Sequence, residues 1–262
     1  MFGRRCSVMG VVHVSALPGS AGYGGDIEKI VETALSDAML YKSEGIDALM
    51  VENMHDAPYL RGHVYPETTA AMAIVASAIK RETKLPCGVQ ILAGANDEAL
   101  GVAIASGLDF MRVEGFVFAH VGDEGFHDSC AATLIRRRAN LKAEQIKIFA
   151  DIKKKHSSHA ITSDISIVET AHAAEFFKAD GVVITGQSTG HAPDVKEVEA
   201  VKNGAHLPVL IGSGITPENL AQFAKFADCL IVGSSAKRDG HWANEVEAAR
   251  VGKLMAAIAQ LV

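Results

Sequence analysis

The chain has 262 residues, of which 48% are hydrophobic and 21% are charged, and its formal net charge is −6 at pH 7. This length suits one (β/α)8 barrel or two smaller domains, and the composition supplies a large apolar core. The negative charge and the lack of a long basic patch argue against a nucleic-acid partner, and no apolar run approaches the roughly 18 residues of a membrane span.

Short apolar segments predict the strands, and an amphipathic segment follows each of them. In chain order the predicted strands are 7–12, 48–52, 88–92, 110–114, 147–151, 181–185, 209–211 and 229–232. Helices are expected at 66–83, 97–106, 165–178 and 244–260, among others, and Asp26, Asn96 and Asp194 stand at expected N-caps. The strand–helix units repeat every 20–40 residues, roughly the length of one βα unit. This repeat predicts an α/β fold, a single (β/α)8 TIM barrel over residues 1–262.

An open, doubly wound sheet is the alternative with the same order of elements. It would need a Gly-x-Gly-x-x-Gly pattern at a strand-to-helix turn, and the sequence has none there. The glycine-rich segment 19–25 also lacks the Gly-Lys-Ser/Thr ending of a P-loop. These absences favour the closed barrel.

Gly/Ser turns follow the last two predicted strands, at 212–214 and 233–235. Glycine lets backbone amides turn toward a bound anion, and Thr216 with Pro217 is expected to begin the next helix. Two ordinary turns that simply need glycine are the alternative interpretation. Paired turns after the last strands are typical of the phosphate site of (β/α)8 barrels. The predicted phosphate-binding residues are Gly186, Gly212, Ser213, Gly214, Gly233, Ser234 and Ser235.

Polar residues cluster at the ends of the other predicted strands, where the chemistry of a barrel takes place. The candidate catalytic residues are His13, Glu52, Arg112, Asp151 and Lys153. Strand alternation predicts that Asp151 and Lys153 enter the mouth together, with Cβ atoms roughly 6–7 Å apart. Such a lysine serves as an acid or base, a Schiff-base amine or a phosphate ligand; a structural ion pair at the rim is the alternative.

No motif implies a cofactor, and no tight structural metal site is predicted. A divalent cation held by His13, Glu52, Glu114 and Asp151 is an alternative, because these residues supply oxygen and imidazole ligands. No local spacing requires it. The loop histidines are interpreted as solvated side chains; they are His120, His127, His156 and His159.

The cysteines and the chain start favour a cytoplasmic protein. Cys6, Cys87, Cys130 and Cys229 fall in separate elements without a Cys-x-x-Cys pair, so buried reduced thiols are expected. Residues 1–5 precede the first predicted strand and are too few for a signal or transit peptide. A homo-oligomer is compatible with these features.

An ordered set of motifs along nearly the whole chain resembles the BtpA family. They are GVVHVSALPGS at 10–20, VENMHDAPY at 51–59, RVE at 112–114 with GDEG at 122–125, ADIKKKH at 150–156, VITG at 183–186 and GSG at 212–214. The family is similar in fold to ribulose-phosphate-binding barrels and takes its name from a role in photosystem I biogenesis. Two functions are therefore expected: an isomerase, aldolase or lyase acting on a small phosphorylated metabolite, or a non-catalytic factor in the biogenesis of a membrane protein complex.

Overall fold

The computed structural model describes residues 6–261 and contains a closed barrel of parallel strands. The barrel strands in chain order are β1 (Ser7–His13), β2 (Ala48–Glu52), β3 (Cys87–Gln90), β4 (Phe110–Val113), β7 (Lys147–Ile152), β9 (Gly181–Ile184), β10 (Val209–Ile211) and β11 (Cys229–Val232). Closure occurs between β1 and β11, where Ser7 pairs with Cys229 and Gly10 with Val232. The predicted (β/α)8 barrel is thus confirmed.

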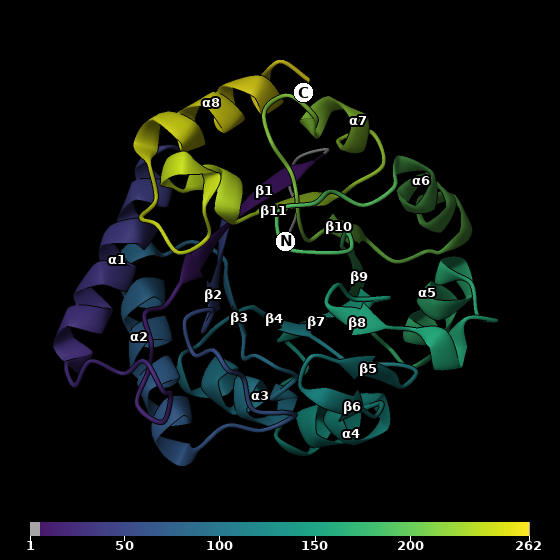
Figure 1. Cartoon of the computed structure of the whole chain (residues 1–262), viewed down its shortest axis with the longest axis horizontal. Coiled ribbons are helices and arrows are strands. Elements are labelled where there is room, and N and C mark those ends of the chain that lie inside the picture. The colour runs from purple at the N-terminus through teal and green to yellow at the C-terminus, as the bar shows by residue number, and fades with distance from the viewer. Residues whose placement is uncertain (1–5, 262) are drawn as a thin grey trace.

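Helices surround the barrel, as Figure 1 shows. They are α1 (Ile27–Ser43), α2 (Pro66–Thr83), α3 (Asn96–Ala105), α4 (Ala131–Asn140), α5 (Ile167–Phe176), α6 (Val195–Gly204), α7 (Leu220–Phe223) and α8 (Ala248–Ala259). Within the described residues, no helix combines the length and the apolar composition needed to cross a bilayer. Residues 1–5, which the sequence analysis considered too few for a signal or transit peptide, lie outside the described part.

Side-chain alternation along the strands builds two apolar layers. Met9 and Val11 of β1 belong to the cluster inside the barrel, whereas Val8 and Val12 pack outward against the helices. Inside, the rings of Phe110 and Phe149 lie 5.4 Å apart between centroids. Because these rings fill the interior, the barrel is a packed core. A ligand can therefore bind only at the carboxyl-terminal mouth of the barrel.

A small antiparallel sheet lies outside the barrel and was not predicted. It consists of β5 (His120–Gly122), β6 (Gly125–His127) and β8 (Ser157–Ser158), in the order β6-β5-β8. Its strands belong to the loops that follow β4 and β7, so these loops are tied to each other. The remaining elements are the 3₁₀ turns η1 (Ala160–Thr162), η2 (Ser234–Ala236) and η3 (Arg238–Gly240).

Several predicted helix ends differ from the structure. Asn96 is the first residue of α3, and its side-chain amide donates to the carbonyl of Glu114. The helix expected after Thr216 shrinks to α7, because the amide of Thr216 is capped by Asn219 Oδ1 in a preceding turn. The last helix begins at Ala248, since residues 237–247 form a loop pinned by the buried Lys237–Asp37 ion pair of 3.0 Å. Cys6, Cys87 and Cys229 are buried free thiols, as expected, and Cys130 is partly exposed.

Candidate functional site

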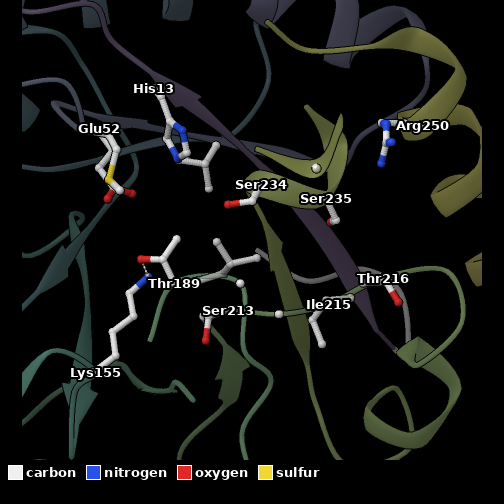
Figure 2. A pocket seen from close by; sticks show the side chains of 18 of the residues that line it. His13, Glu52, Lys155, Thr189, Ser213, Ile215, Thr216, Ser234, Ser235 and Arg250 are labelled. Carbon is white, nitrogen blue, oxygen red and sulfur yellow. Dashed lines mark hydrogen bonds between the residues drawn. The ribbon is translucent and has the colours of Figure 1, made fainter. Parts of the chain in front are cut away.

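A cavity of about 200 Å³ opens at the carboxyl ends of the barrel strands. Most of the predicted site residues line it, namely His13, Glu52, Arg112, Gly212, Ser213, Gly214, Gly233, Ser234 and Ser235. Figure 2 shows Ser235 and Arg250 on one side of this cavity and Glu52 and Lys155 on the other. The sequence analysis therefore named most of the residues that line this cavity, although several others were not predicted.

One side of the cavity presents free backbone amides. The N–H groups of Gly214, Ser234 and Ser235 donate to no protein acceptor within residues 6–261. Free amides in such turns favour an anion, and the guanidinium of Arg250, which donates to the Glu247 carboxylate at 2.8 Å, also lines this cavity. This end of the cavity, called the anion grip below, has the donors that a phosphate requires.

Ser213 and Gly186 support the anion grip from behind. The Ser213 hydroxyl donates to the carbonyl of His191 at 2.8 Å and accepts the amide of Gly186 at 2.9 Å. Both roles of the hydroxyl are thus used within the protein, and Gly186 is absent from the cavity wall. The two residues hold the loop of residues 186–192 against the turn that follows β10.

Gly214 makes the same loop contact and has a positive φ of 70°. A Cβ atom at Gly214 would overlap the backbone of His191 and Ala192. The nearest obstacle to a side chain at position 214 is therefore protein backbone, and not only a bound anion.

We expect Gly214→Val to lower the free energy of unfolding and to weaken phosphate binding together. The positive φ costs roughly 1–2 kcal/mol, and the overlap adds roughly 1–3 kcal/mol by displacing the loop. Gly107→Val is the matched control, because Gly107 has a φ of 64° and open space around it. Chemical denaturation of both variants measures the difference; equal losses would show that the contact with residues 191–192 carries no energy.

Arg112 and Asp151 form a buried ion pair under the cavity. The guanidinium Nε and Nη2 donate to the Asp151 carboxylate at 3.0–3.2 Å, and the two side chains are 6% and 1% exposed. The sequence analysis paired Asp151 with Lys153, two positions further along the same strand. The structure pairs Asp151 with Arg112 across strands, because β4 and β7 are adjacent and Arg112 lies in register with Phe149.

Glu52 and Lys155 line the side of the cavity that faces the anion grip. Burial raises the pKa of the Glu52 carboxyl, with Arg112 and Lys155 acting in the opposite direction. Burial, followed by the charge of Arg112, lowers the pKa of the Lys155 amine, whose Nζ donates to Thr189 Oγ1 at 3.2 Å. Both shifts enlarge the neutral fraction of an acid and of a base in one cavity.

The prediction that Lys153 enters the mouth beside Asp151 is wrong. Strand β7 ends at Ile152, and Lys153 has a φ of 49°, so strand alternation stops before it. Its Nζ donates to the carbonyl of Thr162 at 2.8 Å, outside the cavity that contains the anion grip. Lys155 takes the expected place, because the turn rotates the lysine two positions later into the mouth.

His13 is held as a neutral imidazole. Burial and the nearby charge of Lys237 lower its pKa to about 3. Its Nδ1 lies 2.9 Å from the carbonyl of Trp242, which can only accept, so Nδ1 carries the proton and Nε2 is an acceptor. His13 can therefore orient a hydroxyl of a ligand, but it supplies no positive charge near neutral pH.

Three of the four residues of the suggested cation site, namely His13, Glu114 and Asp151, contact other protein groups. Glu114 accepts from Gln90 Nε2 at 3.2 Å and lies 3.6 Å from Lys154 Nζ, while Asp151 and His13 have the partners given above. Across residues 6–261, no three His, Cys, Asp or Glu side chains are arranged to hold a metal ion. Of the loop histidines, His120 and His127 are buried with their rings stacked at 5.0 Å, contrary to the expectation that they are solvated.

Sequence reasoning missed several cavity residues. Lys155, Thr189, Ile215, Thr216 and Arg250 line the cavity, and Trp242 binds His13 through its carbonyl. The sequence held a signal for Lys155, because three consecutive lysines follow Asp151 and Ile152. Only the backbone turn decides which of the three enters the cavity. Thr189 and Arg250 come from loops and helices distant in sequence, and no local pattern marks them.

The fold is a (β/α)8 barrel, and its main cavity lies at the carboxyl ends of the strands. In fold it resembles thiamine phosphate pyrophosphorylase of Pyrococcus furiosus, with a TM-score of 0.62, 14% identity and 98% of each chain covered. It also resembles (S)-3-O-geranylgeranylglyceryl phosphate synthase of Thermoplasma acidophilum in complex with sn-glycerol-1-phosphate, with a TM-score of 0.60, 18% identity and coverage of 97% and 94%. These likenesses concern the fold alone.

Residues 4–260 match the BtpA family, and the chain belongs to that family. An uncharacterised mitochondrial protein of Caenorhabditis elegans is 46% identical over 256 residues, which cover 96% of this chain and 92% of the relative. The photosystem I biogenesis protein BtpA of Synechocystis is 32% identical, with 97% and 88% covered. An uncharacterised protein of Thermococcus kodakarensis is 38% identical, with 96% and 94% covered.

Proposed function

We propose that this protein is an enzyme that acts on a small phosphorylated metabolite by proton transfer between Glu52, Lys155 and the ligand. The observation that carries the proposal is a single cavity with free backbone amides on one side and, on the other, the buried Glu52 carboxyl and the half-buried Lys155 amine. A ligand whose phosphate is held by the anion grip presents its carbon chain to Glu52 and Lys155. Isomerase, aldolase and lyase reactions on a phosphorylated ligand all use positioned acids and bases, and this arrangement supplies them.

The pKa directions give each residue a task. A neutral Lys155 amine accepts a proton from a carbon beside a carbonyl, while a protonated Glu52 carboxyl donates a proton to the carbonyl oxygen. The same amine can attack the carbonyl carbon, lose water and form a Schiff base. Arg112, held in place by Asp151, supplies positive charge beside the oxygen on which negative charge develops.

A non-catalytic role in the biogenesis of a membrane protein complex is the alternative, and the printed name of the Synechocystis relative supports it. An assembly factor that acts through its surface has no need of buried acids and bases beside an anion site. The buried Glu52, Arg112 and Asp151 therefore favour the enzyme.

Binding of phosphate at the anion grip tests the proposal without a known substrate. Inorganic phosphate or a sugar phosphate at 100 times its dissociation constant should stabilise the native state by about 2.7 kcal/mol, a rise of roughly 5–10 °C in Tm. Ser234→Asp should abolish this rise, because it places a carboxylate among the free amides.

Ser163→Asp is the control for added charge, since Ser163 is exposed and absent from the cavity wall. It should keep the full rise in Tm. If neither phosphate nor any phosphorylated compound raises the Tm of the unmodified protein, the proposed function is wrong.

A further inference from the structure

A second cavity of about 310 Å³ adjoins the first at the barrel mouth. The two share walls at Glu52, Arg112 and Lys155, so the acid–base pair lies between them. A small phosphorylated ligand that occupies the first cavity alone would leave the second cavity unused. The space beyond Lys155 therefore indicates a ligand with a further group attached on the far side of its reacting carbons.

The walls of the second cavity suit a flat ring. They include Met54, Leu92, Tyr59 and Trp242, of which Trp242 is the only tryptophan in the chain. The Tyr59 hydroxyl donates to the carbonyl of Met54 at 2.7 Å, which holds this wall in place. Two aromatic residues and a thioether offer the broad apolar contact on which a planar ring stacks.

Unpartnered acceptors stand at the base of the same cavity. Gln90 Oε1 and Glu114 Oε2 are both buried and have no hydrogen-bond partner among residues 6–261, although Glu114 Oε2 lies 3.6 Å from Lys154 Nζ. Gln90 is only 2% exposed, and its amide nitrogen donates to Glu114 Oε1. Buried acceptors without partners are costly, so they favour a ring that carries N–H donors.

We propose that the second cavity binds a nitrogen heterocycle joined to the phosphate-bearing part of the ligand, so that the ligand class is a phosphorylated riboside such as a nucleoside monophosphate. This inference rests on the proposed function, because the phosphate of the same molecule occupies the anion grip. The ring lies between Tyr59 and Trp242, its N–H groups face Gln90 and Glu114, and the sugar carbons lie at Glu52 and Lys155.

Titration with matched probes tests the inference, because Trp242 is a built-in fluorescent reporter. The probes are inorganic phosphate, ribose 5-phosphate and the four common nucleoside 5′-monophosphates. At least one nucleotide should change the tryptophan emission and bind more tightly than ribose 5-phosphate by about 5- to 100-fold, the range expected for stacking of one base on an aromatic side chain.

Variants distinguish the contribution of the ring to binding from that of the phosphate. Trp242→Ala should remove the advantage of the nucleotide, measured by calorimetry, and leave the affinity for ribose 5-phosphate unchanged. Phe176→Ala is the aromatic control, because Phe176 is 82% exposed and lines neither cavity. Gln90→Leu, which keeps the volume and removes the acceptor, tests the ring subsite without truncating a wall.

The outcomes distinguish this inference from the function on which it rests. If ribose 5-phosphate binds and every nucleotide binds no more tightly, the ring subsite is disproved and the phosphate-dependent function stands. If no phosphorylated compound binds, inorganic phosphate, ribose 5-phosphate and the nucleotides included, both are disproved.

Discussion

Arg112→Met is expected to lower the free energy of unfolding by about 3–5 kcal/mol, since it leaves the Asp151 carboxylate buried without its partner. The pair is almost fully buried, so solvent does not screen the loss. Denaturant unfolding of the variant and the unmodified protein measures it. Arg137→Ala removes the exposed Arg137–Asp97 pair and should cost at most about 1 kcal/mol.

The loss of unfolding free energy caused by Arg112→Met should grow as the pH rises. Burial raises the pKa of Asp151 in the native state, and Arg112 is the main influence that lowers it. Without Arg112, the native carboxyl holds its proton to a higher pH than the unfolded one does, so stability is lost as the pH rises through the native pKa. Unfolding at pH 5 and pH 8 tests this sign. An equal deficit at both values would mean that the protonation of Asp151 does not contribute.

Lys155→Ala is expected to lower kcat by about 100-fold or more, the usual loss when a general base is removed. Lys153→Ala should leave kcat close to that of the unmodified protein, because Lys153 is bonded to Thr162 outside the cavity. The two lysines are two residues apart and have the same side chain, so the comparison isolates position. Turnover is measured with any phosphorylated compound that the thermal screen identifies.

Chemical labelling makes the same comparison without a substrate. Pyridoxal 5′-phosphate carries a phosphate and an aldehyde, so it should direct its aldehyde to Lys155 when its phosphate occupies the anion grip. Reduction with borohydride and peptide mass spectrometry locate the adduct, and inorganic phosphate should protect Lys155. Labelling of Lys153 with protection by phosphate would contradict the assignment of Lys155.

Local patterns were enough to predict the barrel and to place the two Gly/Ser turns at its mouth. Apolar strands, amphipathic helices and glycine turns are each set by residues close in sequence, and eight such units close in a known way. The turns at 212–214 and 233–235 fall at the cavity for the same reason, because their glycines follow strands whose ends all lie on one face. Glu52 and His13 end their strands in register, as Glu52 pairs with His13 between β1 and β2.

Only the tertiary structure decided which of these residues act together. The choice of Lys155 over Lys153 depends on a left-handed residue after β7, and the pairing of Arg112 with Asp151 depends on strand neighbours 39 positions apart. The role of Gly214 depends on a loop that returns from residue 191. The sequence by itself thus determined the fold and the place of the cavity, because both follow from local periodicity, whereas the partners inside the cavity come from contacts between distant segments.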